Sequence, residues 1–262
     1  QFVCGVGDAQ VGEPLALARL YWLCEQRTAG GALSMNYDFD VIARSWEYLF
    51  KEGMTFTLTL TALSMVGGVV LGTALALMRL SPIKPLSAFA GAYVNLMRSL
   101  PLVLVIFWFF FLVPWLGAWI LGSKDPIKVG AFASALITFT LFEAAFFCEI
   151  MRAGIQSIPS GQISAAYAIG LNYRQAMTYV VLPQAFRNML PVLMTQTIIL
   201  FQDTSLVYVI SSTDFLGAAS KVANRDSRLL EMYTFAALVY FVICSLASWG
   251  VRRLQARTAI IR

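Results

Sequence analysis

Five stretches of this sequence are each long and apolar enough to cross a lipid bilayer as a helix. A span needs about 20 predominantly apolar residues, because a helix rises about 1.5 Å per residue and the hydrocarbon core is about 30 Å thick. The chain is 59% hydrophobic and 13% charged, whereas soluble domains are about 45–50% apolar and about 25% charged. We therefore expect an all-α, polytopic membrane protein with about five transmembrane helices, at residues 54–78, 89–113, 129–150, 190–210 and 232–251.

A further apolar stretch, residues 112–121, is too short to span the bilayer. Pro114 and Gly117 predict that it forms the end of the second helix and an interfacial turn. The expected count is therefore odd, which places the two ends of the spanning region on opposite sides of the membrane.

The residues before the first span divide into two parts. Charges interrupt every apolar run in residues 1–34, so we expect an N-terminal extension without function, and the alternative is a real external segment. Met35 is the expected native start. Residues 35–53 mix aromatic and charged side chains and predict an amphipathic lead-in that lies at the membrane interface.

Basic residues in the short loops predict the orientation, because cytoplasmic loops carry an excess of Lys and Arg. One side of the expected bundle is basic with almost no acid, whereas the other side mixes basic and acidic residues. This predicts an external N-terminus, an internal C-terminus, a cytoplasmic loop at residues 151–187 and a basic cytoplasmic tail at 252–262. The basic residues on the predicted cytoplasmic side are Arg79, Lys84, Arg152, Arg174, Arg187, Arg252, Arg253, Arg257 and Arg262.

The residue content excludes several kinds of chemistry. The chain has no His, which excludes histidine-based acid/base, proton-relay and metal chemistry. Its four cysteines are scattered without CxxC spacing, so we expect neither a disulfide framework nor a metal site. The net charge of +5 fits basic cytoplasmic loops better than nucleic-acid binding.

The loop between the third and fourth spans has the features of a helical hairpin. Ser160 is a good N-cap for a short helix, and Gly170 can adopt a positive φ and reverse the chain. A second helix over residues 173–181 is expected to end at Leu182-Pro183. Either the hairpin packs on its own spans, or it presents its first helix to a soluble partner that small side chains allow to approach closely. The small apolar face of that helix consists of Ile163, Ala166 and Gly170.

At these residues the sequence resembles the membrane subunit of bacterial ATP-binding-cassette (ABC) importers, of the polar amino acid permease type. The family's cytoplasmic signature is Glu-Ala-Ala, then Gly four residues later, then Ile-x-Leu-Pro after nine more. Here Ser164 replaces the Glu and Val180 replaces the Ile, with the spacing kept in full. The resemblance covers residues 36–255, and segments 93–101 and 201–209 look most like the glutamate/aspartate members. The residues carried over to the ATPase-coupling loop are Ser164, Ala165, Ala166, Gly170, Leu182 and Pro183.

The resemblance implies a type I ABC importer transmembrane domain at residues 54–251, in the bacterial inner membrane. The loop would dock into a groove of ABC ATPase subunits, and the absence of Glu at position 164 would make small-residue fit more important than a carboxylate contact. Further implied partners are a second permease subunit in a homo- or heterodimer and a periplasmic substrate-binding protein, with the lipid bilayer around the spans and no nucleic acid.

The chain itself is expected to be neither an enzyme nor a cofactor-binding protein. It contains no G-x-x-x-x-G-K-[ST] motif, so a partner must bind and hydrolyse the ATP. The resemblance implies that the cargo is a polar amino acid, with glutamate or aspartate favoured.

Charged and polar groups inside the spans are candidates for the translocation path, because they are costly in hydrocarbon and usually face a bundle interior or water. Arg98 is the basic candidate, and its alternative role is snorkelling to the interface. Glu143 is either a path residue or a protonated or hydrogen-bonded link between helices. Glu149 is expected to pair with Arg152 or Arg98. A polar group late in the fourth span, either a gate or a set of interhelical hydrogen bonds, consists of Gln202, Asp203, Thr204 and Ser205.

An autonomous ion-coupled secondary amino acid transporter is the competing function, with Glu143 and Asp203 as its proton carriers. Against it, the five spans show no convincing internal repeat of the kind that such transporters often have. A membrane enzyme is disfavoured because there is no His, no clustered ligand set and no nucleophile elbow.

Overall fold

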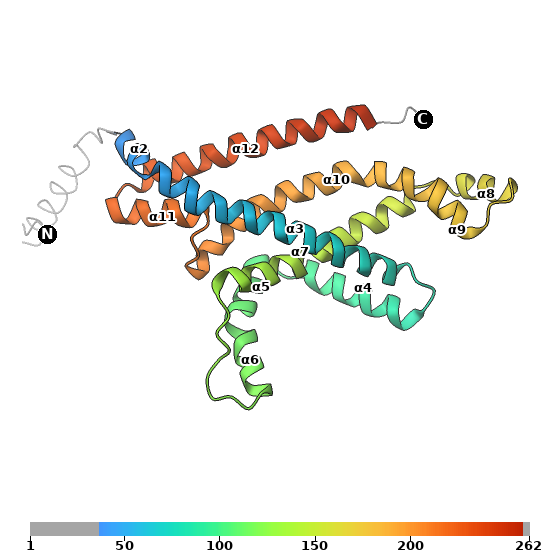
Figure 1. The fold of residues 1–262 in the computed structure, drawn as a ribbon, viewed down its shortest axis with the longest axis horizontal. Helices are drawn as coiled ribbons and strands as arrows, with labels where there is room; N and C mark the ends of the chain where they lie inside the picture. The colour runs from blue at the N-terminus through green and yellow to red at the C-terminus, as the bar shows by residue number, and fades with distance from the viewer. Residues whose placement is uncertain (1–36, 259–262) are drawn as a thin grey trace, which may run out of the picture. The chain divides into compact units, whose positions relative to one another are not determined.

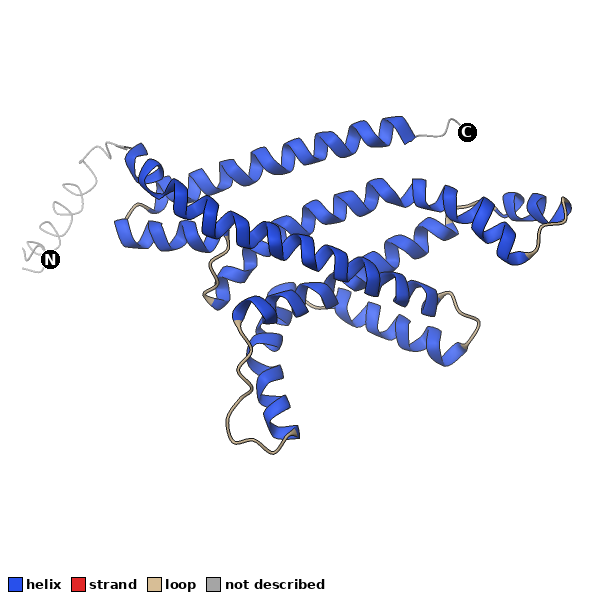
Figure 2. Ribbon diagram, in the orientation of Figure 1, coloured by secondary structure: helices blue, strands red, loops and turns tan. Residues whose placement is uncertain are grey.

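The computed structural model describes residues 37–258, and the elements from Phe39 onward form one compact unit. Every regular element in these residues is helical, and Figure 2 shows helices and loops without a strand in this part of the chain. The expected extension at 1–34 and the last residues of the expected tail, 259–262, lie outside the described residues. The elements are α2 (Phe39–Tyr48), η1 (Leu49–Met54), α3 (Thr55–Arg79), α4 (Lys84–Ser99), α5 (Leu102–Phe107), η2 (Trp108–Leu112), α6 (Val113–Ile120), α7 (Ala131–Gln156), α8 (Ser160–Ala168), α9 (Tyr173–Gln175), η3 (Ala176–Val181), α10 (Leu182–Asp203), η4 (Thr204–Ile210), α11 (Phe215–Asp226) and α12 (Leu229–Thr258).

Helices α3 and α7 pack along each other at the centre of the bundle (Figure 1). A Cβ atom on Gly72 would lie 2.9 Å from the carbonyl oxygen of Ala144 and 3.0 Å from the amide nitrogen of Cys148. The two backbones can approach this closely only because small residues line the contact, as is common between membrane helices. The buried residues of α3 at four-residue spacing are Ser64, Gly68, Gly72 and Ala76.

The second expected span, residues 89–113, is wrong in its bounds. Helix α4 ends before Leu100, whose backbone is extended at φ −102° and ψ 141°. The ring of Pro101 disfavours a helical conformation in the residue before it, so the helix breaks there. The run that is long and apolar enough to span is Leu102–Ile120. Residues 112–121, expected to be a turn, therefore belong almost entirely to this span.

The lead-in expected at residues 35–53 continues into the first span without a break. Helices α2, η1 and α3 form one helical run, Phe39–Arg79, that includes the first candidate span. The lead-in is amphipathic: Val41 and Leu49 are buried, whereas Arg44 is exposed. The buried side chains contact α11 and α12, so this helix is part of the packed unit.

Helix α11 packs across η1 and begins at a side-chain cap. The carboxylate of Asp214 accepts hydrogen bonds from the backbone N–H groups of Leu216 at 3.0 Å and Gly217 at 3.2 Å. Burial raises the pKa of Asp214 to about 7, although these two donors act in the opposite direction. Close packing continues at Gly53, where a Cβ atom would lie 2.9 Å from the Cα of Phe215.

The third, fourth and fifth helical runs extend beyond the apolar windows that predicted them. Hydropathy locates only the part of a helix that lies in hydrocarbon, whereas backbone hydrogen bonding continues through the polar turns at its ends. With the first two, these runs make five candidate membrane spans in the described residues. The three runs are Ala131–Gln156, Tyr173–Ile210 and Leu229–Arg257, in place of the expected 129–150, 190–210 and 232–251.

Candidate functional site

Helix α8 lies at one end of the bundle, between the end of α7 and the return of the chain toward α10 (Figure 1). It begins at Ser160, and Pro159 rather than Ser160 occupies the N-cap position. Gly170 follows the helix with a φ of +84°, which confirms the predicted left-handed reversal. The predicted hairpin is therefore present.

An apolar cluster holds the hairpin against the long helices, and just before the hairpin one side-chain hydrogen bond joins the end of α7 to α10. The amide of Asn188, in α10, donates to the hydroxyl of Ser157 at 2.9 Å, and this hydroxyl donates to the carbonyl of Gly154 in α7 at 2.7 Å. A displacement of α8 would therefore act on both long helices. The cluster has Ile158, Val181 and Ala185 buried, with Ile155, Ile163 and Met177 packed against them.

Small residues lie on two faces of α8, and the structure distinguishes these faces. Ala166 is only 3% exposed and Ile163 is half-buried, so the face expected to meet a partner packs against the chain itself. Of the two alternatives for this face, packing on the chain itself is the one observed at Ile163 and Ala166, because Ile163 joins the apolar cluster and turns that side inward. Of the signature residues, Ser164 and Ala165 lie on the opposite side. The outer face, exposed throughout at helical spacing, consists of Gly161, Ser164, Ala165 and Ala168.

The second helix of the hairpin does not end at Leu182-Pro183. Asn172 starts it with a capping box: its side chain accepts the N–H of Gln175 at 3.0 Å, and the Gln175 side chain accepts the N–H of Asn172 at 2.9 Å. Helices α9, η3 and α10 then follow without interruption. Proline is tolerated in the first turn of a helix, so Pro183 fits at the start of α10. Leu182 and Pro183 are both exposed.

Several large side chains of the hairpin are exposed. Tyr167 is 47% exposed, Ile169 77%, Tyr173 66% and Tyr179 72%. Exposed aromatic side chains grouped in this way are typical of protein interfaces, where they act as anchors. They add exposed apolar area to the hairpin that carries the small outer face of α8.

Three arginines surround Glu149, one each from α3, α4 and α7. The carboxylate accepts from Arg79 and from Arg152, whose Nη2 is 2.7 Å away, and Nη1 of Arg98 lies 3.9 Å away. The guanidinium of Arg98 also lies over the ring of Phe146, 5.5 Å from its centroid. Both expected pairings of Glu149 are confirmed. The partner that sequence reasoning missed is Arg79, whose only signal was its place at the end of the first span.

Glu143 is completely buried in α7 and is hydrogen-bonded to α10. Its Oε2 accepts from Nε2 of Gln196 at 3.0 Å, whereas Oε1 has no hydrogen-bond partner among the described residues. The hydrogen-bonded alternative for Glu143 is therefore the one observed, and its role in the translocation path stays a prediction. Gln196 was missed because nothing in the sequence pairs residues of distant helices.

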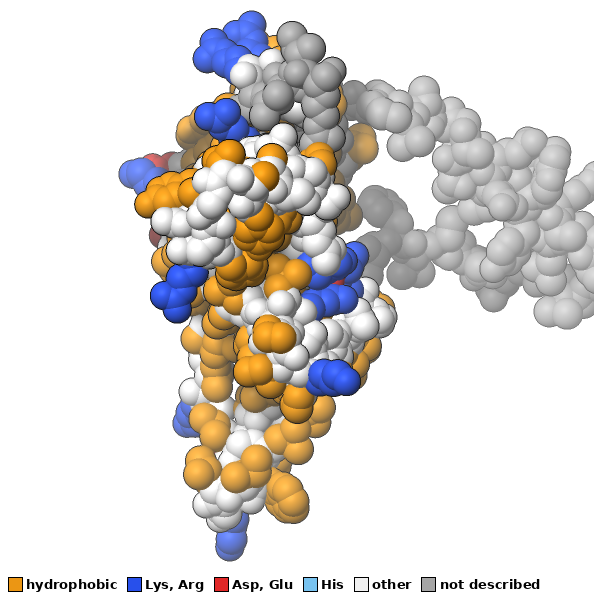
Figure 3. All heavy atoms as spheres, turned by 90° about the vertical axis from the view of Figure 1, so that its right-hand side faces the viewer, with side chains coloured by type: hydrophobic (Ala, Val, Ile, Leu, Met, Phe, Trp, Pro, Cys, Tyr) orange, Lys and Arg blue, Asp and Glu red, His pale blue; other side chains and the backbone are white. Residues whose placement is uncertain are grey.

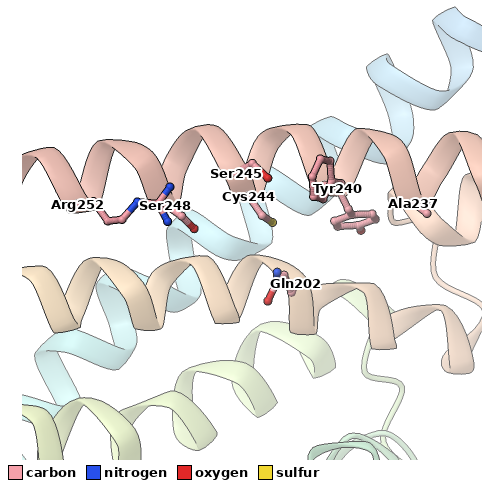
Figure 4. A pocket seen from close by; sticks show the side chains of 8 residues that line it. Gln202, Ala237, Tyr240, Cys244, Ser245, Ser248 and Arg252 are labelled. Carbon is pink, nitrogen blue, oxygen red and sulfur yellow. The ribbon is translucent and has the colours of Figure 1, made fainter.

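The four polar residues around the end of α10 do not form one band. Thr204 is buried, and its hydroxyl donates to the carbonyl of Phe201 at 2.7 Å. Gln202 is exposed and faces α12 (Figure 4), whereas Asp203 and Ser205 are half-buried. Within residues 37–258, none of the four forms a hydrogen bond or ion pair with Arg98 or Glu143. Glu143 and Asp203 nevertheless lie close enough to interact electrostatically, whereas Arg98 pairs with Glu149.

Sequence comparisons connect this chain with transport systems. Residues 68–260 match the family model described as binding-protein-dependent transport system inner membrane component. The chain is 49% identical over 226 residues to the glutamate/aspartate import permease protein GltK of Escherichia coli O6:H1, across 86% of this chain and 99% of that protein. It is 34% identical to the probable glutamine ABC transporter permease protein GlnM of Bacillus subtilis, across 80% of this chain and 93% of that one.

Solved structures agree with the sequence matches. A crystal structure of an amino acid ABC transporter with histidines superposes with a TM-score of 0.76 at 30% identity, across 84% of this chain and 98% of that chain. An inward-facing structure of the MetNI methionine ABC transporter gives a TM-score of 0.63 at 20% identity, across 81% of this chain and 97% of that chain, which supports the fold alone. The chain therefore belongs to the family of inner membrane components of binding-protein-dependent transport systems, among the permeases of amino acid ABC importers.

Proposed function

We propose that this chain is the membrane-spanning permease subunit of an ABC importer that carries glutamate and aspartate across the bacterial inner membrane. The choice of substrate rests on the 49% identity to GltK over nearly the whole of that protein. Permeases named for glutamine and cystine are 34% and 35% identical to this chain. The acidic amino acids are therefore the substrate class that similarity favours.

The energy comes from partner ATPase subunits that dock on the hairpin. No phosphate-binding loop motif occurs in the 262 residues, so we assign ATP binding to the partner. The exposed outer face of α8 has only Gly, Ser and Ala side chains, which allow a groove to approach its backbone closely. The exposed tyrosines of the hairpin supply aromatic anchors for the partner.

The fastening of the hairpin explains how docking drives transport. When ATP brings two ATPase subunits together, α8 moves with them, and the apolar cluster that contains Ile163 transmits the motion to α7 and α10, which the Ser157–Asn188 hydrogen bond joins to each other. Packed helices respond by moving as rigid bodies between two arrangements. The permease then alternates between inward-facing and outward-facing states.

Charge supports an N-out, C-in orientation. Arg79, Arg152 and Arg252 lie near the C-terminal ends of α3, α7 and α12, and these helices finish at the end of the unit that carries α8 (Figure 1). Figure 3 views this end directly, with Lys and Arg side chains at several places and Asp and Glu scarcely visible. The cytoplasmic side of a membrane protein is the basic one. A periplasmic substrate-binding protein then meets the opposite end, and a second permease subunit completes the pore.

Transport by purified components tests this proposal. The complex of permease, its pore partner and ATPase is reconstituted into proteoliposomes, and uptake of labelled glutamate is measured with substrate-binding protein and ATP. We expect uptake that requires all of these components and that unlabelled aspartate inhibits. Uptake by this chain alone, driven by an ion gradient without ATPase, would establish the competing secondary transporter. ATP-dependent uptake of another amino acid, with no glutamate uptake, would overturn the substrate assignment but not the assignment as an importer subunit.

A further inference from the structure

The last turns of α12 carry basic residues and no acidic ones. The helix runs from Leu229 to Thr258 and has 30 residues, so it rises about 45 Å. The hydrocarbon core is only about 30 Å thick, and part of α12 therefore projects beyond it. After Glu231 the sequence contains no Asp or Glu, and its basic residues are Arg252, Arg253, Arg257 and Arg262.

The uncharged part of α12 ends where these arginines begin. Residues 232–251 contain no charge and rise about 30 Å, so they fill the hydrocarbon and leave the following arginines among the lipid headgroups. Trp249 lies next to this boundary and is 48% exposed. Tryptophan is enriched at this depth of a membrane, because its ring is apolar and its N–H group can meet polar groups.

Trp249, Arg253 and Arg257 form one exposed stripe along the helix. They are four residues apart, so they lie on the same side at successive turns. The guanidinium of Arg253 lies over the ring of Trp249, 3.8 Å from its centroid. The ring attracts the cation, and this contact keeps the charge close to the membrane boundary. Arg252, the preceding residue, instead lines a groove between α10 and α12 (Figure 4).

The two arginines of the stripe differ from those of α3, α4 and α7 in their partners. The latter three all face the carboxylate of Glu149. Arg253 and Arg257 form no ion pair with any residue from 37 to 258. A guanidinium binds a phosphate group with two parallel hydrogen bonds, and basic residues next to the cytoplasmic leaflet attract anionic lipids. The stripe thus has the charge and the depth that suit a phospholipid headgroup.

We propose that the stripe of Trp249, Arg253 and Arg257 is a binding site for the headgroup of an anionic phospholipid. The lipid phosphate accepts hydrogen bonds from Arg253, and Arg257 pairs with the headgroup farther from the hydrocarbon. An acyl chain then lies along the exposed side chains of Val242 and Leu246, which precede Trp249 on the same side of the helix. This inference rests on the proposed orientation, in which α12 ends at the cytoplasmic leaflet.

Quenching by labelled lipids tests the site. In a chain whose four native cysteines are replaced, Gly250→Cys carries a dansyl label beside the stripe, where a Cβ atom has nothing within 4 Å. The full complex is reconstituted into vesicles with nitroxide-labelled phosphatidylglycerol or nitroxide-labelled phosphatidylcholine. We expect phosphatidylglycerol to bind about tenfold more tightly at the label, because two arginines lie at the leaflet. Equal quenching by the two lipids would overturn the proposal.

Arg253→Gln, compared with Arg252→Gln, separates a site from a general attraction between charges. Both variants remove one positive charge from the same turn of the helix, but only Arg253 belongs to the stripe. We expect Arg253→Gln to lower the preference for phosphatidylglycerol by about fivefold and Arg253→Lys to retain part of it. Arg252→Gln should stay within about twofold of the original chain. Equal losses in the two glutamine variants would overturn the proposal.

Two further measurements exclude other occupants of the stripe. We expect the lipid preference to persist when inorganic phosphate is added, and the ATPase to co-purify in full with Arg253→Gln. Loss of the preference in phosphate would assign Arg253 to a soluble anion, and loss of the ATPase would assign it to a subunit contact. Either result overturns the proposal. Quenching requires no transport, so failure of the proposed function is recognised separately, by the absence of glutamate uptake.

Discussion

Two helices of this protein carry small residues on one face, at comparable spacing and with opposite exposure. On α3 the face formed by Ser64, Gly68, Gly72 and Ala76 is buried against α7. On α8 the face formed by Gly161, Ser164, Ala165 and Ala168 is exposed. Both faces allow another backbone to approach closely, but only the first has its neighbour within the same chain.

The difference in exposure separates a contact within the folded chain from a surface that is left for contact with another subunit. The contact between α3 and α7 is complete, because a second helix of the same chain fills it. The apolar cluster packs against the inner side of α8, and the outer face of this helix has no neighbour among the described residues. Substitutions on the two helices should therefore have different consequences, for folding in one case and for assembly in the other.

The largest expected effect is that of Gly72→Leu, which acts on the buried face. The first added carbon would already lie 2.8 Å from Cβ of Phe147 and 2.9 Å from the backbone oxygen of Ala144, so α3 must move away from α7. Overpacking of this kind costs about 3 kcal/mol or more. We expect the variant to be lost from membranes or to unfold at much lower temperature in detergent. Gly250→Leu is the control, since nothing lies within 4 Å of a Cβ atom there, and its stability should be unchanged.

A smaller effect is expected for Glu149→Gln, which removes the charge that fastens the end of this same contact. The substitution leaves Arg79 and Arg152 facing each other without an acid, and their side chains are only 21% and 29% exposed. We expect a loss of about 2 kcal/mol, between the values for exposed and fully buried pairs, measured as a lower unfolding temperature in detergent. Glu47→Gln breaks an exposed pair with Lys51 and should change nothing measurable. Equal stability of the two variants would remove the structural role assigned to Glu149.

The smallest of these effects is expected for Asn172→Ala, within the hairpin. The substitution removes the capping box that starts the return helix, which is worth about 1 kcal/mol. Hydrogen exchange should become faster in residues 172–181 and stay unchanged in α3 and α7. Faster exchange throughout the unit would show that the hairpin and the bundle unfold together, against the distinction drawn above.

Features set by local chemistry were predictable from sequence. Apolar length gave five spans, and the need for a left-handed residue gave the turn at Gly170. The charge of Glu149 among nearby basic residues gave its pairing with Arg152 and Arg98. In each case the physical cause lies in a single residue type or in one short stretch of sequence.

Features that depend on contacts between distant segments were not predictable in the same way. Hydropathy is continuous across Pro101, so it could not locate the break, although the restriction on the residue before a proline pointed to it. Both faces of α8 are small, so periodicity alone could not tell which one Ile163 would turn inward. The groove between α10 and α12 requires two helices to be placed side by side before Arg252 has a neighbour from α10.

The central claim is that the outer face of α8 is the place where an ATPase subunit docks, and one co-purification measures it. The complex is purified through the permease with Ala165→Arg, which adds bulk to that face, and with Asn224→Arg, an exposed position on α11 at the other end of the unit (Figure 1). We predict that Ala165→Arg remains inserted and folded but retains less of the ATPase by about tenfold, whereas Asn224→Arg retains it in full. Full retention of the ATPase by Ala165→Arg would contradict the account.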